Sequence, residues 1–245
     1  PMTDPILAQM AAHRTVRAFL PDPVPTGDIR RVVSAAQMAA TSSWIQAYSL
    51  LQVTRPTERA ALSELAGNQA QVRDAGAFFV VLADTRRHRR IQTERGKPYA
   101  HNLEVFLTAS IDASLFAQNV QLGFEALGYG TCCIGALRND VQAVCKVLEL
   151  PEGVYPLFGL CVGRPAADPG LRPRLATETV WFEDRYPSDD TLREQVREAD
   201  ALAAPYYAER GQSGRDWSGA MARRFDHLER TPLRGDYEAQ GASFE

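Results

Sequence analysis

The sequence predicts one α+β domain that is followed by a more polar C-terminal arm. Between residues 5 and 165, short runs rich in β-branched and aromatic residues alternate with segments of helical periodicity. One segment, Leu103 to Leu127, is long and strongly apolar, which is typical of a core helix. After Pro165 the density of apolar residues falls, so this part is expected to wrap around another surface rather than fold alone.

Two helices are predicted near the N-terminus. Residues 5–12 carry apolar side chains at helical spacing, and a second helical pattern runs from Thr26 to Ala36. Thr26 is predicted to be the N-cap of the second helix, because its hydroxyl can accept a hydrogen bond from the first turn. The proline-rich loop at residues 20–25 separates the two helices.

The predicted strands are short apolar runs bounded by polar or turn-forming residues. They lie at 48–54, 77–83, 131–134 and 155–162, and a further extended patch is expected at 179–182. Periodic segments between and after the strands predict the remaining helices, at 57–65, 103–127, 140–150, 191–210 and 217–230. Gly128 and Gly130 end the long helix before the third strand begins.

The long apolar helix does not predict a membrane span. Glu104, Asp112 and Glu125 would have to lie in hydrocarbon, which costs several kcal/mol or more for such groups. A net charge of −3 also gives no reason to expect a nucleic-acid or membrane partner. The basic run at residues 86–90 is interpreted as a solvated loop, because no aromatic side chains are interleaved with it.

Cysteine and histidine spacing gives no metal or disulfide framework. Cys132, Cys133, Cys145 and Cys161 show no CxxC pattern, so we expect reduced and mostly buried thiols. The histidines lack metal-ligand spacing, and no metal site is predicted. The N-terminal residues have no charged region followed by an apolar one, so a cytoplasmic location is expected.

Two groups of arginines predict an anion site. The first group combines guanidinium forks with a hydroxyl and consists of His13, Arg14, Thr15 and Arg17. The second group lies far along the chain and consists of Arg172 and Arg174. Together they suit a phosphate monoester that is held at several points. Only two of the cations in this chain are lysines, so the presence of arginine at a given position carries little information. The first group could therefore also be an ordinary exposed helix end.

Three further segments are rich in small or polar residues that the core does not require. Residues 40–46 and 67–69 offer donors and acceptors that suit the polar edge of a flat heterocycle, although a turn explains either segment alone. Residues 133–138 place small side chains after a strand, where backbone can approach a ligand closely.

The order of these motifs resembles the FMN-dependent nitroreductases, and within them the NADPH-preferring subgroup of oxygen-insensitive nitroreductases and FMN reductases. The landmarks are HRTVRAF, ATSSWIQ, GNQ, ADTRRH, IGALRND, PGLRPRL and the ERG and RDWS pieces of the arm. The resemblance implies a three-layer α+β fold, with a mostly antiparallel central sheet flanked by helices. It further implies a flavin-binding core at 1–175 and an arm at 176–245 that extends across a homodimer.

The resemblance also assigns roles to individual residues. The catalytic candidates are Arg17, Ser43 and Arg230, with Arg17 beside the N1 and C2 carbonyl edge of the flavin and Arg230 beside the substrate channel. The loop at 41–43 is expected to come from the other subunit. Residues expected to contact FMN are His13, Arg14, Thr15, Arg17, Thr41, Ser42, Ser43, Gln69, Cys133, Ile134, Gly135, Ala136, Leu137, Arg172 and Arg174. Arg210 and Arg215 are candidates for the 2′-phosphate of NADPH.

The activity that the resemblance implies is hydride transfer from NADPH through FMN to nitroaromatics, quinones or flavins, by a ping-pong mechanism. One alternative is a reductase that supplies reduced FMN to a partner protein. Another is a flavin-binding sensor or partner-binding module without turnover, and a nucleotide-binding domain without flavin is the fallback. The physiological acceptor, the choice between NADPH and NADH, and the roles of Cys132 and Cys133 stay open.

Overall fold

A four-stranded antiparallel sheet forms the centre of the fold in the computed structural model, which describes residues 4–226, 230 and 232–245. The strands are β1 (Tyr48–Gln52), β2 (Ala77–Asp84), β3 (Gly130–Ile134) and β4 (Val154–Gly163), in the order β1-β2-β4-β3. In register, Tyr48 lies opposite Ala83, Ala77 opposite Val162 and Gly130 opposite Gly163. The predicted α+β class and the antiparallel sheet are confirmed.

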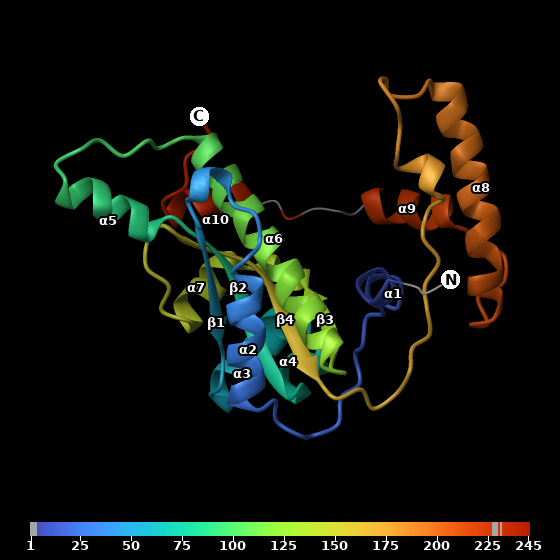
Figure 1. The fold of residues 1–245 in the computed structure, drawn as a ribbon, viewed down its shortest axis with the longest axis horizontal. Helices are drawn as coiled ribbons and strands as arrows, with labels where there is room; N and C mark the ends of the chain where they lie inside the picture. Colours follow the sequence, from blue (N-terminus) through green and yellow to red (C-terminus); the bar gives the residue numbers. More distant parts are fainter. Residues whose placement is uncertain (1–3, 227–229, 231) are drawn as a thin grey trace. The chain divides into compact units, whose positions relative to one another are not determined.

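Helices cover both faces of this sheet, which gives three layers (Figure 1). Along β2, Phe79 and Val81 belong to the core that includes α2 (Thr26–Ala36) and α6 (Leu103–Ala126), whereas Phe78 and Val80 belong to the opposite core. The opposite core is closed by three helices, α3 (Pro56–Leu65), α4 (Ala70–Asp74) and α7 (Val141–Val147). Strand β2 is buried along its whole length because successive side chains point into different layers.

Several elements differ from those expected from the sequence. The basic run predicted as a solvated loop is helix α5 (Arg86–Glu94). The patch at 179–182 is not a strand, because it begins within the 3-10 turn η3 (Thr177–Thr179). Pro25, not Thr26, is the N-cap residue of α2, and it gives no side-chain cap. The other helices are α1 (Pro5–Ala11), α8 (Asp189–Ala208), α9 (Trp217–Asp226) and α10 (Leu233–Ala239), with 3-10 turns η1 (Ser42–Trp44) and η2 (Gly135–Asn139).

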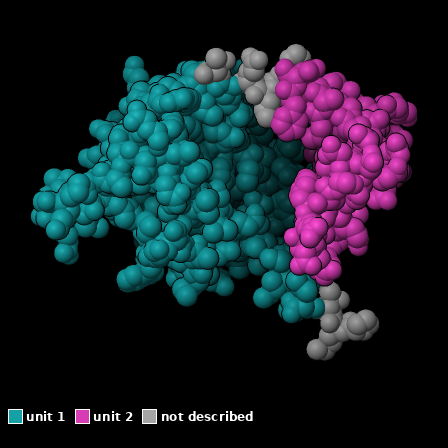
Figure 2. All heavy atoms as spheres, turned by 90° about the horizontal axis from the view of Figure 1, so that it is seen from above, with its two compact units in different colours: residues 1–169, 230–245 teal, residues 170–229 magenta. Residues whose placement is uncertain are grey.

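The chain forms two compact units, which Figure 2 distinguishes by colour. The first contains residues 1–169 together with 230–245, and the second contains residues 170–229. The predicted arm, 176–245, therefore includes a last segment that belongs to the first unit. There, Tyr237 of α10 is buried and its hydroxyl donates to the carbonyl oxygen of Pro156 at 2.8 Å. In the described part of the chain, no helix combines the length and the apolar character that a bilayer crossing requires.

The cysteines agree with the expectation of reduced and mostly buried thiols. All four are free, and only Cys133 is exposed at the protein surface. Burial raises the pKa of the Cys145 thiol to about 12 and also raises that of Cys161. Thiolate formation is therefore disfavoured at these two positions.

Candidate functional site

The segment that contains His13 to Arg17 lies alongside β3. Thr15 pairs with Thr131 in a parallel bridge, and the Val16 amide donates to the Thr131 carbonyl at 2.9 Å. A side chain at Gly130 would bring its Cβ within 2.6 Å of Val16, so this close approach depends on glycine. The first predicted segment is thus held against the strand that leads into residues 133–137.

The predicted 67–69 segment reaches the same strand. Gly67 and Asn68 form a left-handed turn, with φ values of 79° and 59°. The Gln69 side-chain amide stabilises this turn by donating to the Ala66 carbonyl oxygen at 2.9 Å. Two residues further on, the Gln71 side chain lies close enough to the Cys132 thiol of β3 to lower its pKa. Burial raises the pKa of Cys132, whereas the nearby positive charge of Arg17 and the Gln71 side chain oppose this rise.

His13 is held by a carboxylate on the core helix. Its Nδ1 lies 2.7 Å from Glu125 Oε1, and the same oxygen accepts a hydrogen bond from Thr131 Oγ1, also at 2.7 Å. Gln121, one turn earlier on α6, donates to this carboxylate at 3.3 Å and accepts a hydrogen bond from Cys133 Sγ at 3.4 Å. The sequence did not single out Glu125 or Gln121 as site residues.

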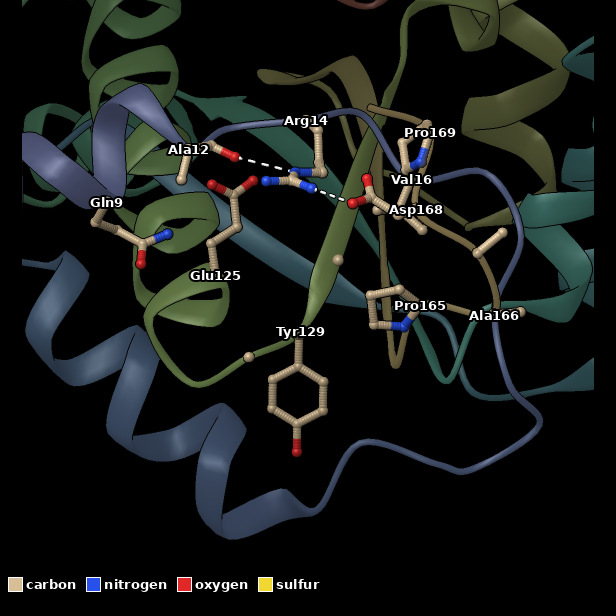
Figure 3. Close-up of a pocket in the computed structure, with 13 residues that line it drawn as sticks. Gln9, Ala12, Arg14, Val16, Glu125, Tyr129, Pro165, Ala166, Asp168 and Pro169 are labelled. Carbon is tan, nitrogen blue, oxygen red and sulfur yellow. Dashed lines mark hydrogen bonds and ion pairs between the residues drawn. The ribbon is translucent and has the colours of Figure 1, made fainter. Parts of the chain in front are cut away.

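Arg14 makes a different set of contacts from its neighbours. Its guanidinium pairs with Asp168 at 2.6 Å and donates to the Ala12 carbonyl at 3.3 Å, as Figure 3 shows. Arg14, Val16 and Glu125 line a cavity of about 490 Å³ that is closed on another side by residues 165–169. The contact of Arg14 with phosphate stays a prediction. In the structure, its ion pair with Asp168 helps to hold residues 165–169.

Residues 133–137 run from the end of β3 into the 3-10 turn η2. Cys133 is exposed, whereas Ile134 and Leu137 are buried in the core below the turn. Arg230 Nε donates to Asn139 Oδ1 at 3.2 Å, at the end of the same turn. The structure therefore brings a predicted substrate-channel residue to the segment that is expected to line the flavin ring.

The loop with Thr41, Ser42 and Ser43 lies at a different place, beside Asp112 of α6. The fully buried carboxylate of Asp112 accepts hydrogen bonds from the backbone amides of Ser42, at 2.9 Å, and Ala47, at 3.1 Å. Between these anchors the chain is tightly wound, since Ser43, Trp44 and Gln46 all have positive φ. Asp112 thus fixes a strained loop that presents Ser43 and Trp44 to solvent.

An apolar stripe lies on the exposed face of α6. Leu103, Leu107, Ile111 and Leu115 follow one another at four-residue spacing on α6, and each is 40–55% exposed. The loop that Asp112 anchors also exposes a large apolar side chain, Trp44, which is 83% exposed. Contiguous exposed apolar surface of this kind marks an interaction face, whereas isolated exposed residues are common.

The remaining predicted cations lie in the second unit. Arg172 and Arg210 both stack on the Tyr206 ring, with guanidinium-to-centroid distances of 5.6 and 3.7 Å. Arg174 donates to the Arg172 carbonyl at 2.9 Å, and Arg215 donates to Gln212 Oε1 at 2.6 Å. Arg172 and Arg174 also line a cavity of about 250 Å³ with residues of α8 and α9.

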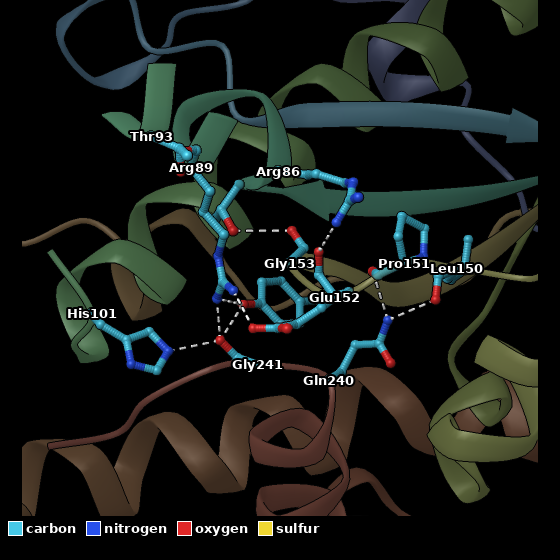
Figure 4. Close-up of polar contacts among 12 residues, drawn as sticks. Arg86, Arg89, Thr93, His101, Leu150, Pro151, Glu152, Gly153, Gln240 and Gly241 are labelled. Carbon is cyan, nitrogen blue, oxygen red and sulfur yellow. Dashed lines mark hydrogen bonds and ion pairs between the residues drawn. The ribbon is translucent and has the colours of Figure 1, made fainter. Parts of the chain in front are cut away.

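The basic run on α5 is engaged in structural contacts. Arg86 donates to the Glu152 carbonyl at 3.1 Å, and Arg87 donates to the Tyr48 carbonyl at 2.5 Å. Arg89 pairs with the Glu152 carboxylate and also donates to the carbonyl oxygen of Gly241 (Figure 4). These arginines therefore hold the C-terminal segment and the sheet, which explains the run without a nucleic-acid partner.

Comparison with known proteins decides the family. The nitroreductase family model matches residues 10–164, and the model of the nitroreductase C-terminal domain matches residues 172–245. The chain belongs to the nitroreductase family. This nitroreductase is 38% identical over 235 residues to a protein of Bacillus subtilis named FMN reductase (NADPH), with 94% of each chain covered. It is 35% identical over 233 residues to an oxygen-insensitive NADPH nitroreductase of Salmonella typhimurium, covering 94% of this chain and 92% of the relative.

Solved nitroreductase structures share the whole architecture. NfrA1 of B. megaterium superposes with a TM-score of 0.94 at 37% identity, covering 98% of this chain and 99% of NfrA1. The NADPH:FMN oxidoreductase of Vibrio harveyi, in complex with NAD+, gives a TM-score of 0.89 at 28% identity, with 99% and 100% covered. The resemblance found in the sequence is confirmed at the level of family and subgroup, and the chain is an oxidoreductase.

The predicted segments 13–17 and 133–138 both adjoin β3, the first by pairing with it and the second by following it. The predicted 67–69 turn ends two residues before Gln71, which lies near Cys132 of β3, and the 41–43 loop is anchored to Asp112 of α6. The sequence did not single out Asp112 and Glu125, whose carboxylates hold the 42–47 loop and His13. Asp112 lies among Ala109, Ala113 and Phe116 on the apolar face of α6, and a charge at such a position was the available signal.

Proposed function

We propose that this chain binds FMN and transfers hydride from NADPH to small electron acceptors such as nitroaromatics, quinones or free flavin. The observation that carries the proposal is the pairing of residues 13–17 with β3, the strand that leads into residues 133–137. The names of two relatives, an FMN reductase (NADPH) and an oxygen-insensitive NADPH nitroreductase, support the same reductant and cofactor.

The chemistry of the residues around β3 fits FMN. His13, Thr15 and Arg17 supply donors for a phosphate and ribityl chain at one end of the site. The exposed Cys133 and the small residues Gly135 and Ala136 leave backbone accessible at the other end, where a flat ring would lie. When bound, FMN supplies a centre that accepts and releases hydride.

The side chains of the protein act by binding and by electrostatics. Arg17 would place positive charge at the edge of the ring where negative charge develops on reduction, which stabilises the reduced state. Ser43, from a partner subunit, would contact the same site, and Arg230 would line the channel for the acceptor. The position of Arg230 beside η2 supports this last role.

We propose a homodimer in which the apolar stripe of α6 packs against a second copy of the chain. A second copy would cover Leu107, Ile111 and the neighbouring loop with Trp44, and would bring that loop to the partner's flavin site. The Asp112 anchor supports this arrangement, because a loop that completes another subunit's site must be held in a fixed conformation.

The purified protein is expected to be yellow, with the absorption spectrum of FMN, and to bleach rapidly when NADPH is added. The double variant Arg14→Ala/Arg174→Ala is expected to be colourless while it keeps the thermal unfolding temperature of flavin-free wild type. Full flavin occupancy in the double variant would contradict the phosphate assignment. A yellow protein that NADPH does not bleach would favour a sensor, and a wild type that is always colourless would favour a nucleotide-binding domain.

Replacement of Arg210 by alanine is expected to raise the KM for NADPH by roughly tenfold and to leave the KM for NADH nearly unchanged. The reason is that only NADPH carries a 2′-phosphate, which the Arg210 guanidinium would bind; this guanidinium stacks on the Tyr206 ring. Steady-state kinetics with both reductants measures this, with Arg193→Ala on the exposed surface of α8 as the control. Equal changes for the two reductants would reject the role.

A flavin reductase that supplies a partner protein is the second candidate, favoured by the name of the B. subtilis relative. The two functions differ in the acceptor. A kcat/KM for free FMN well above that for nitroaromatics and quinones would favour the reductase, and the reverse would favour the nitroreductase.

A further inference from the structure

The buried side chain of Glu125 connects both ends of the proposed flavin site. It extends from the last turn of α6 and is only 8% exposed. Its Oε1 atom lies 2.7 Å from His13 Nδ1 and 2.7 Å from Thr131 Oγ1. Both contacts reach from the core helix to the two paired segments of the site, the 13–17 segment and β3.

A second set of contacts continues from Glu125 to the ring end of the site. Gln121 Nε2 donates to Glu125 Oε1 at 3.3 Å, and Gln121 Oε1 accepts from Cys133 Sγ at 3.4 Å. Cys133 begins the segment expected to line the flavin ring. One carboxylate therefore contacts the histidine at the phosphate end directly and the ring-lining segment through one amide.

The chemistry of this contact fixes the state of the imidazole. An ionised carboxylate accepts hydrogen bonds and donates none, so Nδ1 of His13 carries a hydrogen and donates it to Glu125. In the imidazolium form both ring nitrogens carry a hydrogen, so Nε2 can donate to a phosphate while Nδ1 donates to Glu125. The Gln121 side-chain nitrogen also lies 3.1 Å from Nδ1 and 3.5 Å from Nε2. The carboxylate also prevents rotation of the ring, because rotation would break a bond of 2.7 Å between two largely enclosed groups.

Packing alone does not explain a carboxylate at this position. The second oxygen, Oε2, is buried and has no hydrogen-bond partner among the residues that the structure describes. Burial of a half-satisfied carboxylate is unfavourable, and an apolar side chain would fill the same space without that cost. The carboxylate is better explained by the orientation it gives to His13.

We propose that Glu125 is a positioning residue that orients His13 for the phosphate of FMN. This inference rests on the proposed function, since it names a new residue of the same site. It separates the contribution of Glu125 from that of its neighbour on the cavity, Arg14, which is paired with Asp168 instead. Glu125 acts through His13 and does not itself contact the flavin.

The test compares FMN with riboflavin, which has the same ring and ribityl chain but lacks the phosphate. Full-length protein freed of flavin is titrated with each compound, and binding is followed by quenching of flavin fluorescence. Glu125→Gln is expected to weaken FMN binding roughly tenfold and to leave riboflavin binding within about twofold of wild type. In a His13→Ala background, Glu125→Gln is expected to cause no further loss of FMN affinity.

Controls keep the result specific to the position. Glu104→Gln, at an exposed site on the same helix, is expected to change neither affinity. If Glu125→Gln does not fold, Glu125→Asp replaces it, because its shorter carboxylate cannot keep the 2.7 Å contact and should reduce the preference for FMN over riboflavin.

Two outcomes would overturn the inference. One is an equal loss of affinity for FMN and riboflavin, which indicates a general structural defect. The other is an undiminished effect of Glu125→Gln in the His13→Ala background. A wild-type protein that binds neither flavin would instead overturn the proposed function itself, so the two failures are distinguishable.

Discussion

Replacement of Ile111 by glutamate is expected to yield a monomer that has lost its bound flavin. Ile111 is 55% exposed at the middle of the α6 stripe, so a carboxylate there would be buried against the partner's apolar surface. If the 41–43 loop of each subunit completes the flavin site of the other, separation of the subunits removes that loop from both sites.

Molecular mass by light scattering and the flavin-to-protein absorbance ratio measure this effect. Ile91→Glu is the matched control, because Ile91 is an isoleucine on α5 that is 48% exposed, outside the stripe. The control is expected to keep both mass and flavin. A dimer of unchanged mass in the Ile111 variant would show that subunits meet elsewhere.

Replacement of Asp112 by alanine is expected to reduce the free energy of unfolding by about 3 kcal/mol. The change leaves the amides of Ser42 and Ala47 without their carboxylate, and hydrogen bonds to a charged group contribute about 1.5–3 kcal/mol. The 42–47 loop, which carries three residues with positive φ, is expected to relax, so flavin affinity should also fall.

Denaturant unfolding and flavin titration on the same samples measure the two effects. Asp112→Asn keeps one acceptor oxygen and is expected to lose about half as much stability. Asp190→Ala removes an exposed ion pair on α8 and is expected to change stability by less than about 0.5 kcal/mol. Full stability in Asp112→Ala would mean that the loop does not depend on this anchor.

Most of the sheet and the core helix could be predicted from the sequence, because their signals are local. The predicted strand at 77–83 became β2, and the long periodic segment became α6 with a difference of one residue at its end. Helix α5 was missed because its apolar content is low, and its contacts with the Tyr48 and Glu152 carbonyls exist only after folding. Helix α10 was missed because seven residues carry little periodicity.

The site was predictable as a set of segments but not as a set of contacts. Motif order indicated the candidate phosphate and ring segments, and β3, with which the first of them pairs, leads into the second. His13 is held by Glu125, which lies 112 positions away in the sequence, and Ser42 is held by Asp112, which lies 70 positions away. No local pattern encodes such pairs, although charged residues on an apolar helix face mark one of the two partners.

The return of residues 230–245 to the first unit makes the second unit an insertion that is tethered at both ends. A single protease cut between residues 170 and 226 would sever the polypeptide. The C-terminal fragment would nevertheless stay bound to the first unit, because Tyr237 is buried there and Arg89 contacts Gly241. Loss of the same fragment by an early stop codon would uncover Tyr155 and Phe106, which pack against Tyr237. A truncated product would therefore be more prone to aggregation than a nicked one.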